Sequence, residues 1–371
     1  MKAGWEIKKL GDISRVVNGG TPKTGVPEYW NGHHRWITPA EMGKRSSPYV
    51  SETERRNTDS GLQNSSAEML PPYSVILSSR APIGYLVINL QPMATNQGCK
   101  GIVPSKNLHH EFLYYYLSGN VDTLRSLGTG TTFKELSGGK LKEVEIPLPP
   151  LPEQQRIVGI LDEAFENIAL ATVNAETNLK NASALFESHL NDIFSKRGDG
   201  WMETTIGEQI RLQRGFDITK ELQREGHVPV VSSGGIKSFH DTPMARAPGV
   251  VIGRKGTLGK VFYLEKDYWP HDTTLWVKEF NGNLPRFVYH FLTGIDVHRL
   301  NSGAANPALN RNQVHPIRVF WPQISQQKIL ATQFDALAVE TQRLASIYHR
   351  KLAALDELKK SLLHRAFTGQ L

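Results

Sequence analysis

The chain of 371 residues contains the same series of short landmarks twice. Three pairs of segments match: Gly4-Trp5 with Gly200-Trp201, Leu117-Ser118-Gly119 with Leu292-Thr293-Gly294, and Gln154-Gln155-Arg156-Ile157 with Gln326-Gln327-Lys328-Ile329. The spacing between matching segments falls along the chain, so the second copy is the shorter one. A period of nearly half the chain is too long for a solenoid, whose repeats have about 20–50 residues. The duplication therefore predicts two related domains with two copies of one binding surface.

Composition indicates a folded protein of two ordinary domains. Hydrophobic residues make up 39% of the chain, enough for a core in each copy. Cys99 is the single cysteine, which excludes an internal disulfide and a thiolate zinc site and fits a reducing cytosol. The first ten residues are charged where a signal peptide is apolar, and no apolar run of about 18 residues occurs. We expect a cytoplasmic chain.

The net charge of +7 is unevenly distributed along the chain. Residues 1–150 carry +4, residues 151–197 carry −3, and residues 198–322 and 323–371 carry +3 each. Both globular copies are thus basic, which suits contact with a phosphate backbone because neutralised phosphates release condensed counterions. Charges of this size also occur on ordinary protein surfaces, so charge alone leaves nucleic-acid binding open.

Two kinds of sequence composition alternate along the chain. Residues 1–150 are rich in Gly, Pro, Ser and Thr and contain short β-like runs, with a short helix expected at 111–117 and its counterpart at 286–292. From 153 to 197 no proline and only Gly159 interrupts the sequence, which predicts a long helix, and 325–367 repeats it. We therefore divide the chain into 1–150, 151–198, 199–322 and 323–371.

Both long stretches carry an apolar stripe with alternating steps of three and four residues, broken in the first at Asn178. A helix of this length, roughly 69 Å at about 1.5 Å per residue, is too long to bury its stripe on one small domain. The positions expected at the interface are Ile157, Leu161, Ile168, Ala175 and Leu185 in the first helix, and Leu337, Leu344, Leu355 and Leu362 in the second. The predicted fold class is α+β: two tandem, pseudo-symmetric mixed α/β domains, each followed by a long helix, with the helices packing as an antiparallel coiled coil. The alternative is that each stripe covers only its own domain.

Three segments resemble a known family. The proline-rich run at 147–158 that leads into the first long helix, the opening at 4–13 and the ending at 362–371 are similar to the specificity subunit of type I restriction-modification systems. The resemblance extends over the whole chain and includes the order domain, helix, domain, helix.

The resemblance implies a concrete function. Two target-recognition domains would each read one half of a bipartite, asymmetric site in double-stranded DNA, with the helices as a ruler between them. The chain itself would hold no catalytic centre, metal or cofactor. Its partners would be two methyltransferase subunits that bind S-adenosylmethionine and flip the target base and, where restriction is required, two restriction subunits that use ATP and Mg. The alternative from another class is a coiled-coil adaptor that binds proteins and not DNA.

A search for catalytic motifs favours a chain without an active site. Pro71-Pro72-Tyr73 resembles part of an amino-methyltransferase motif, but Leu70 stands where a carboxylate or amide must grip the target amine. The segment 253–261 imitates a phosphate-binding loop with one residue too many and a Val in place of Ser or Thr. The pairs His33-His34 and His109-His110 should point to opposite faces of a strand, so we expect no metal site.

Candidate DNA contacts lie in loops that occupy similar positions in the two copies. Arginines in glycine-bearing turns suit phosphate or guanine, and Asn and Gln suit adenine, although polar side chains in turns are as often local caps. The loops 18–27 and 214–220 differ most and are expected to read bases. The candidates are Lys23, Arg80, Asn96, Gln97, Lys100, Thr131, Thr132, Lys134, Arg214, Lys220, Lys237, Arg254, Lys255, Lys260, Thr273 and Asn306.

Overall fold

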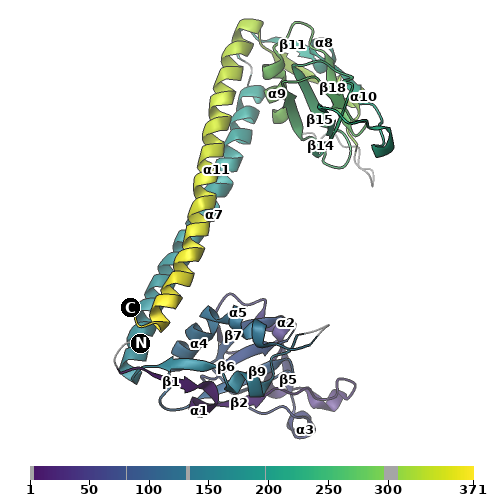
Figure 1. Ribbon diagram of the computed structural model, residues 1–371. Helices are drawn as coiled ribbons and strands as arrows, with labels where there is room; N and C mark the ends of the chain where they lie inside the picture. The colour runs from purple at the N-terminus through teal and green to yellow at the C-terminus, as the bar shows by residue number, and fades with distance from the viewer. Residues whose placement is uncertain (1–3, 81, 131–133, 197, 296–307) are drawn as a thin grey trace. The chain divides into compact units, whose positions relative to one another are not determined.

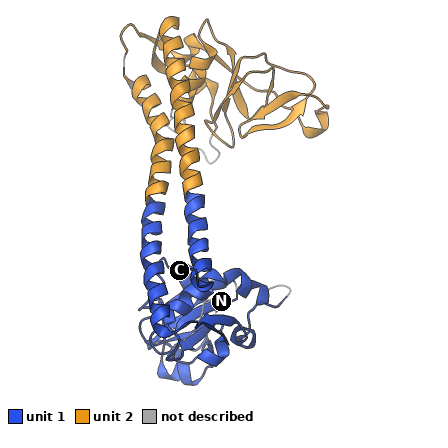
Figure 2. Ribbon diagram, turned by 60° about the vertical axis from the view of Figure 1, so that its left-hand side comes forward, with its two compact units in different colours: residues 1–173, 352–371 blue, residues 174–351 orange. Residues whose placement is uncertain are grey.

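The computed structural model describes residues 4–80, 82–130, 134–196, 198–295 and 308–371 (Figure 1). The chain forms two compact units (Figure 2). The first unit contains Met1–Val173 and Leu352–Leu371, and the second contains Asn174–Lys351. Both long helices pass from one unit into the other, so each unit includes a part of both.

The first unit is built on a five-stranded sheet (Figure 1). Its strand order is β2 (Ser14–Asn18), β9 (Cys99–Pro104), β6 (Val75–Ser79), β7 (Ile83–Asn89) and β4 (Tyr49–Val50). All five residues of β6 are buried. Alternate side chains point to opposite faces of a strand, and Val75 and Leu77 accordingly enter one apolar cluster while Ile76 enters another. The sheet is therefore covered on both faces.

Smaller elements complete this unit. A three-stranded sheet has the order β5 (Arg55–Asn57), β3 (Trp30–Ile37) and β8 (Met93–Thr95), and β1 (Glu6–Lys9) pairs with β10 (Glu145–Leu148). The short helices are α1 (Leu10–Ile13), η1 (Pro27–Tyr29), α2 (Pro39–Met42), α3 (Asp59–Gln63), α4 (His110–Gly119), α5 (Val121–Leu127) and α6 (Gly138–Lys142).

The second unit repeats this plan with four strands in place of five in the main sheet. Its main sheet has the order β12 (Arg211–Arg214), β18 (Thr274–Glu279), β15 (Gly249–Gly253) and β16 (Val261–Leu264). The second sheet has the order β14 (Gly235–His240), β13 (Val228–Ser232) and β17 (Trp269–Pro270), and β11 (Met202–Thr205) pairs with β19 (Arg318–Trp321). The short helices are α8 (Ile206–Gln209), η2 (Lys220–Leu222), α9 (Pro285–Gly294) and α10 (Arg311–Val314).

The register of the β2–β9 pair recurs in the β12–β18 pair, apart from a shift between Arg211 and Leu212. Asn18 lies opposite Lys100 in the β2–β9 pair, and Arg214 lies opposite Leu275 in the β12–β18 pair. The parallel pair of β3 with β8 likewise matches that of β13 with β17. Asn18 and Arg214 are as many residues apart in the sequence as the two Gly-Trp landmarks are. Lys100 and Leu275 are as many residues apart as the two landmarks at the ends of the short helices are. The strands thus repeat with the spacings that the sequence landmarks predict.

The long helices are α7 (Leu151–Ser195) and α11 (Ile324–Phe367), and they pack together as an antiparallel pair. In the first unit a groove between them is lined by Phe165 and Ile168 of α7 and by Leu352 and Leu355 of α11. In the second unit the rings of Phe194 and Phe334 lie 5.5 Å apart. This confirms the predicted coiled coil.

The alternative that each helix covers its own domain also holds at the helix ends. Ile157 and Leu161 of α7 join the core of the first unit, but so do Leu363 and Ala366 near the end of α11. The core of the second unit contains Ala331 of α11 and is packed against Phe194 of α7. Each core is thus closed by the beginning of one helix and the end of the other.

One expected interface position is wrong. Leu185 is 50% exposed, and Phe186 is the half-buried residue of that turn. The stripe runs through Leu179, also half-buried, so Asn178 does not interrupt it. The remaining expected positions are buried or half-buried: Ile157, Leu161, Ile168, Ala175, Leu337, Leu344, Leu355 and Leu362.

A buried glutamine joins each long helix to its domain. The Gln154 side chain is fully buried; its Oε1 accepts from the backbone N–H of His109 at 2.8 Å, and its Nε2 donates to the carbonyls of Asn107 and Pro149 at 2.9 and 2.8 Å. Because His109 offers α4 no side-chain cap, this glutamine ties the start of α4 to the start of α7.

Gln327 occupies the equivalent place in the second unit. Its Oε1 accepts from the N–H of Leu284 at 2.9 Å, and its Nε2 donates to Pro322 O at 3.0 Å and to Asn283 Oδ1 at 2.7 Å. The structural partner of Gln154 is therefore Gln327 and not its neighbour Gln326, which the sequence match suggested.

A second tie involves an aspartate further along each long helix. In the first unit, Tyr115 of α4 donates a hydrogen bond to Asp162. In the second unit, His290 and Arg286 of α9 contact Asp335 at 2.6 and 2.8 Å. Burial holds the pKa of His290 below its ordinary value, although the contact with Asp335 acts in the opposite direction.

None of the helices in the described ranges combines the length and the apolar character needed to cross a bilayer.

Candidate nucleic-acid interface

In the first unit, the loop after β2 lies against the turn between β8 and β9. The N–H of Gly19 donates to Cys99 O at 3.2 Å, and the N–H of Gly20 donates to Thr95 O at 2.9 Å. A Cβ atom added at Gly19 would lie 1.9 Å from the backbone oxygen of Asn96. Glycine at this position is thus what allows the two segments to meet.

Three polar side chains converge where these segments meet, and we call Thr21, Asn96 and Gln97 the first loop cluster. Asn96 Nδ2 donates to the Thr21 hydroxyl at 2.9 Å, and that hydroxyl donates to Gln97. Asn96 Oδ1 also accepts from the N–H of Gly98 at 2.8 Å. Arg80 lies beside the cluster, because a Cβ atom added at Gly98 would be 3.3 Å from its Cγ. The cluster is neutral and offers both donors and acceptors.

The second unit brings the equivalent segments together. The N–H of Gly215 donates to Thr274 O at 3.1 Å, and a Cβ atom there would lie 2.1 Å from His271 O. We call Asp217, His271 and Asp272 the second loop cluster. One ligand-type atom of each of these side chains lies within 4.8 Å of the other two.

The second loop cluster is held by its neighbours. Arg214 Nη2 donates to Asp272 Oδ2 at 2.9 Å, and the N–H of Thr273 donates to His271 Nδ1 at 3.3 Å. His271 Nδ1 also lies 3.0 Å from Asp272 Oδ1 and 3.0 Å from the Thr273 hydroxyl. The cluster therefore combines carboxylate acceptors with an arginine donor and an imidazole.

A polar groove of about 620 Å³ adjoins this cluster. Its charged and amide side chains are Gln213, Arg214, Asp217, Arg254, Asn310, Arg311 and Asn312. The first unit has uncharged residues at the positions of these three arginines. The strand registers match Asn18 with Arg214 and Ser79 with Arg254, and the helix N-caps match Gly138 with Arg311. A Cβ atom at Gly138 would lie 3.1 Å from Asn18 Oδ1, so these positions are neighbours there too. Three arginines in one unit thus correspond to three uncharged residues in the other.

The structure corrects the interpretation of two predicted contacts. Lys100 is buried, with 7% of its side chain exposed, and its ammonium lies 3.7 Å from Glu135. It pairs with the half-exposed carboxylate of Glu135 and is not an exposed cation available to DNA, contrary to our expectation. Arg80 corresponds to Lys255 and not to Arg254, because the N–H groups of Ser79 and Arg254 make the equivalent bonds, to Gly98 O and Thr273 O.

The other candidates are scattered. Arg214, Arg254, Lys255 and Thr273 lie around the second loop cluster. Exposed lysines outside the two clusters are Lys23, Lys134, Lys220, Lys237 and Lys260. Thr131, Thr132 and Asn306 lie outside the described residues. Thr21 and Asp217 lie in the loops 18–27 and 214–220 that were expected to read bases, and the spacing of the two Gly-Trp landmarks pairs them, whereas Arg311 was not among the predicted contacts.

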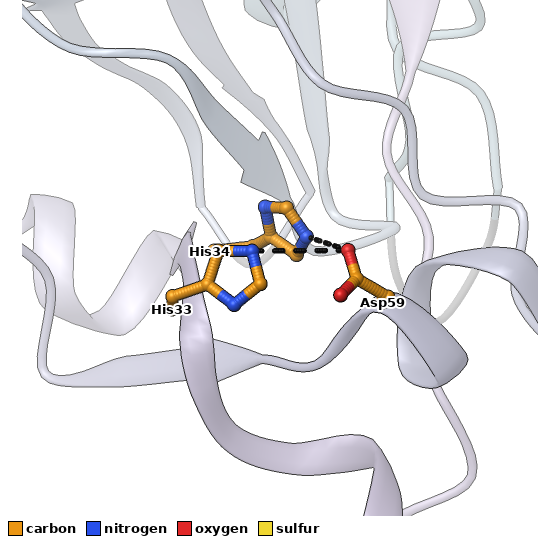
Figure 3. A group of neighbouring side chains, drawn as sticks. All are labelled: His33, His34 and Asp59. Carbon is orange, nitrogen blue, oxygen red and sulfur yellow. Dashed lines mark hydrogen bonds and ion pairs between the residues drawn. The ribbon is translucent and has the colours of Figure 1, made fainter.

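A group of potential metal ligands in the first unit contradicts our expectation for adjacent histidines. The rings of His33 and His34 lie 3.9 Å apart, and their Nε2 atoms lie 3.7 and 2.7 Å from Asp59 Oδ1 (Figure 3). The pairing of β3 with β5 is irregular between Trp30 and His34, and Asn31 has a left-handed φ of 60°. The strict alternation of side chains is therefore lost here. The hydrogen bond from His34 lowers the pKa of Asp59.

Two sets of described side chains thus have the donor atoms of a metal site. His33, His34 and Asp59 would supply two nitrogens and one oxygen, and the second loop cluster would supply one nitrogen and two oxygens. Both sets include exposed carboxylates, which commonly hold no ion.

Fold and surface define a class: a duplicated α+β protein with paired long helices and polar loop clusters on both units. Residues 2–181 and 198–349 match the model of the type I restriction modification DNA specificity domain. The chain belongs to this family.

Relatives agree with this assignment. The type I restriction enzyme MjaIX specificity subunit of Methanocaldococcus jannaschii is 34% identical over 231 residues, 57% of this chain and 52% of that protein. The chain thus spans about half the length of that relative. The EcoprrI specificity subunit of Escherichia coli is 22% identical over 358 residues, 91% of this chain and 88% of the relative.

Two solved structures share the fold. A chain from a study of complex assembly and conformational transition of the type I R-M system has a TM-score of 0.83 at 15% identity, covering 100% of this chain and 99% of that one. The HsdS subunit of Thermoanaerobacter tengcongensis has a TM-score of 0.67 at 16% identity, covering 100% and 98%.

Proposed function

We propose that this chain is the DNA specificity subunit of a type I restriction-modification complex. Each unit contributes a recognition domain that reads one half of a bipartite, asymmetric DNA site. The observation that carries this proposal is the repeated pair of loops, which presents polar side chains at the same place in both copies on an otherwise matching scaffold. Membership of the specificity-domain family supports the same function.

The chain binds no cofactor in this proposal and performs no chemistry. Two methyltransferase subunits would dock on the paired helices and supply S-adenosylmethionine. Two restriction subunits would add ATP- and Mg-dependent cleavage. The assignment of such roles to partners rests on the type I family and on the absence of methyltransferase or nucleotide-binding motifs in the sequence.

The decisive experiment is to co-express the chain with the methyltransferase subunit of the same host and to map methylated adenines across the genome. A single asymmetric motif, split by a fixed unspecified gap, is expected. Methylation that is absent, or unchanged when this chain is omitted, would favour the protein-binding adaptor instead. An adaptor would also fail to retain DNA in a salt-dependent manner, whereas a specificity subunit loses affinity steeply as salt rises.

The role of the helices as a ruler has its own test. Inserting seven residues at facing positions, after Thr172 in α7 and before Leu352 in α11, adds two turns and keeps both stripes in register. Each helix then lengthens by about 10.5 Å, or about three base pairs at about 3.4 Å each. We expect the unread gap to grow by about three base pairs. The control is a seven-residue insertion beside Gly282, where the surface is open; an unchanged gap in the helix variant would refute the ruler.

A further inference from the structure

The two loop clusters have matching backbones. Thr21, Asn96 and Gln97 correspond to Asp217, His271 and Asp272 at the spacings fixed by the strand registers. Four hydrogen bonds of the first unit recur in the second. Between the two loops, Gly19 N to Cys99 O matches Gly215 N to Thr274 O, and Gly20 N to Thr95 O matches Phe216 N to Pro270 O. Within the turn, Cys99 N to Asn96 O matches Thr274 N to His271 O, and Gly98 N to Asn96 Oδ1 matches Thr273 N to His271 Nδ1.

The side chains on this shared backbone have different chemistry. The first loop cluster holds a hydroxyl and two amides, whereas the second holds two carboxylates and an imidazole. A position that only supports the loop needs the same chemistry in both units, as the Asn96 and His271 acceptors for a backbone N–H do. Of the positions that differ, Gln97 and Asp217 are exposed, whereas their counterparts Asp272 and Thr21 are half-buried. Each divergent position therefore has an exposed side chain in one of the two units.

The chemistry of each cluster matches a different base pair. Asn and Gln side chains pair with adenine through N6 and N7, whereas a carboxylate accepts from cytosine N4 and an arginine donates to guanine O6 and N7. Asp272 and Arg214 are already in contact at 2.9 Å, so they present an acceptor and a donor side by side. A C·G pair offers the complementary donor and acceptors on adjacent bases.

We propose that the two loop clusters read bases in the two domains, with the first selecting an A·T pair through Gln97 and the second selecting a G·C pair through Asp272 and Arg214. This inference rests on the proposed function. The groove beside the second cluster extends its surface with Arg254 and Arg311, for which the first unit has Ser79 and Gly138. The two half-sites should therefore differ because the clusters differ.

The test is an exchange of side chains in the full chain, co-expressed with the methyltransferase subunit of the same host. The variant Arg214→Asn, Asp217→Thr, His271→Asn and Asp272→Gln gives the second domain the chemistry of the first. Bound DNA is selected from a random pool and sequenced. We expect one G·C position of the second half-site to become A·T, with a change in preference of about 5- to 150-fold, and the first half-site to stay as in the unmodified chain.

Asp272→Asn is a second variant that keeps the shape of the side chain, and it should lose the G·C preference alone. The control Glu225→Gln with Glu265→Gln removes two exposed carboxylates elsewhere in the same unit and should change neither half-site. An unmodified chain that selects no split site refutes the proposed function itself. An unmodified chain that selects one, while both cluster variants leave the second half-site intact, overturns only this inference. So does a second half-site whose selection is abolished by a chelator, because the cluster would then hold a metal ion.

Discussion

The buried glutamine at the start of α7 offers the sharpest test of how a domain is fixed to its helix. Gln154 makes three hydrogen bonds of 2.8–2.9 Å to backbone groups of three different residues, and its side chain is fully buried. Replacing it with alanine leaves one N–H and two carbonyls without that partner. Each neutral hydrogen bond contributes about 0.5–1.5 kcal/mol net, so we expect Gln154→Ala to weaken the junction by about 2–4 kcal/mol.

Hydrogen exchange measures this loss where it occurs. The N–H of His109 and the amides of α4 exchange when the junction opens locally. A loss of about 2–4 kcal/mol in the free energy of this opening makes exchange at those amides about 30- to 1000-fold faster, since about 1.4 kcal/mol is tenfold. The matched control is Gln155→Ala, because Gln155 is the next residue in the same turn and is exposed. Gln327→Ala should speed exchange in α9 and leave α4 unaffected.

Equal exchange in α4 of Gln154→Ala and Gln155→Ala would refute a junction role for Gln154. So would a Gln154→Ala variant that exchanges faster by the same factor throughout the chain, because the glutamine would then support global stability and not the junction.

Three further predictions concern the helix stripe, a buried histidine and the single cysteine. In urea unfolding, Phe186→Ala should lower the free energy of unfolding of the second unit by about 1–2 kcal/mol, since the ring is only half-buried. Leu185→Ala should change it by less than about 0.5 kcal/mol. Equal effects of the two variants would mean that Leu185 lies in the helix interface after all. Burial lowers the pKa of His290, so the unfolded chain takes up the proton first as pH falls below about 6.5, and stability of the second unit declines there; thermal unfolding between pH 7.5 and 5.5 should show this slope and His290→Tyr, which copies Tyr115, should flatten it. Burial raises the pKa of the Cys99 thiol to about 12, so a thiol reagent at pH 8 should label the unfolded chain and spare the native one, and rapid native labelling would contradict the buried position.

The duplication made the architecture predictable from the sequence. Two domains, two long helices and their pairing all follow from repeated landmarks and from a stripe too long for one domain. The phase of the stripe was harder to predict. Steps of three and four can be taken in either order along a helix. The sequence pattern assigned Asn178 and Leu185 to the apolar stripe, whereas in the structure the stripe runs through Leu179 and Phe186. Only the facing helix decides between these phases.

The exact pairing of residues between the copies was beyond sequence matching for a similar reason. Letter identity aligns Gln154 with Gln326, yet the structure requires a glutamine that reaches a carbonyl five residues earlier, which is Pro149 for Gln154 and Pro322 for Gln327. The histidine pair shows the same limit, because a left-handed Asn31 and an irregular strand pairing override the alternation that the strand pattern predicts. Local geometry, not composition, determines these positions.

A comparison of the two units distinguishes the residues that keep their type from those that differ. The junction glutamines retain both their residue type and the kind of partner they bind, because a buried amide that lost its carbonyl and N–H partners would be costly. The loop clusters retain only their backbone, and they can do so because Gly19 and Gly215 allow a close approach that any Cβ atom would block, at 1.9 and 2.1 Å from a backbone oxygen. Since backbone bonds between the loops hold the turn, the outward side chains are released from a structural role. Under the function that we propose, the exchange of a few polar side chains would give such a protein a new half-site without rebuilding the domain that carries them.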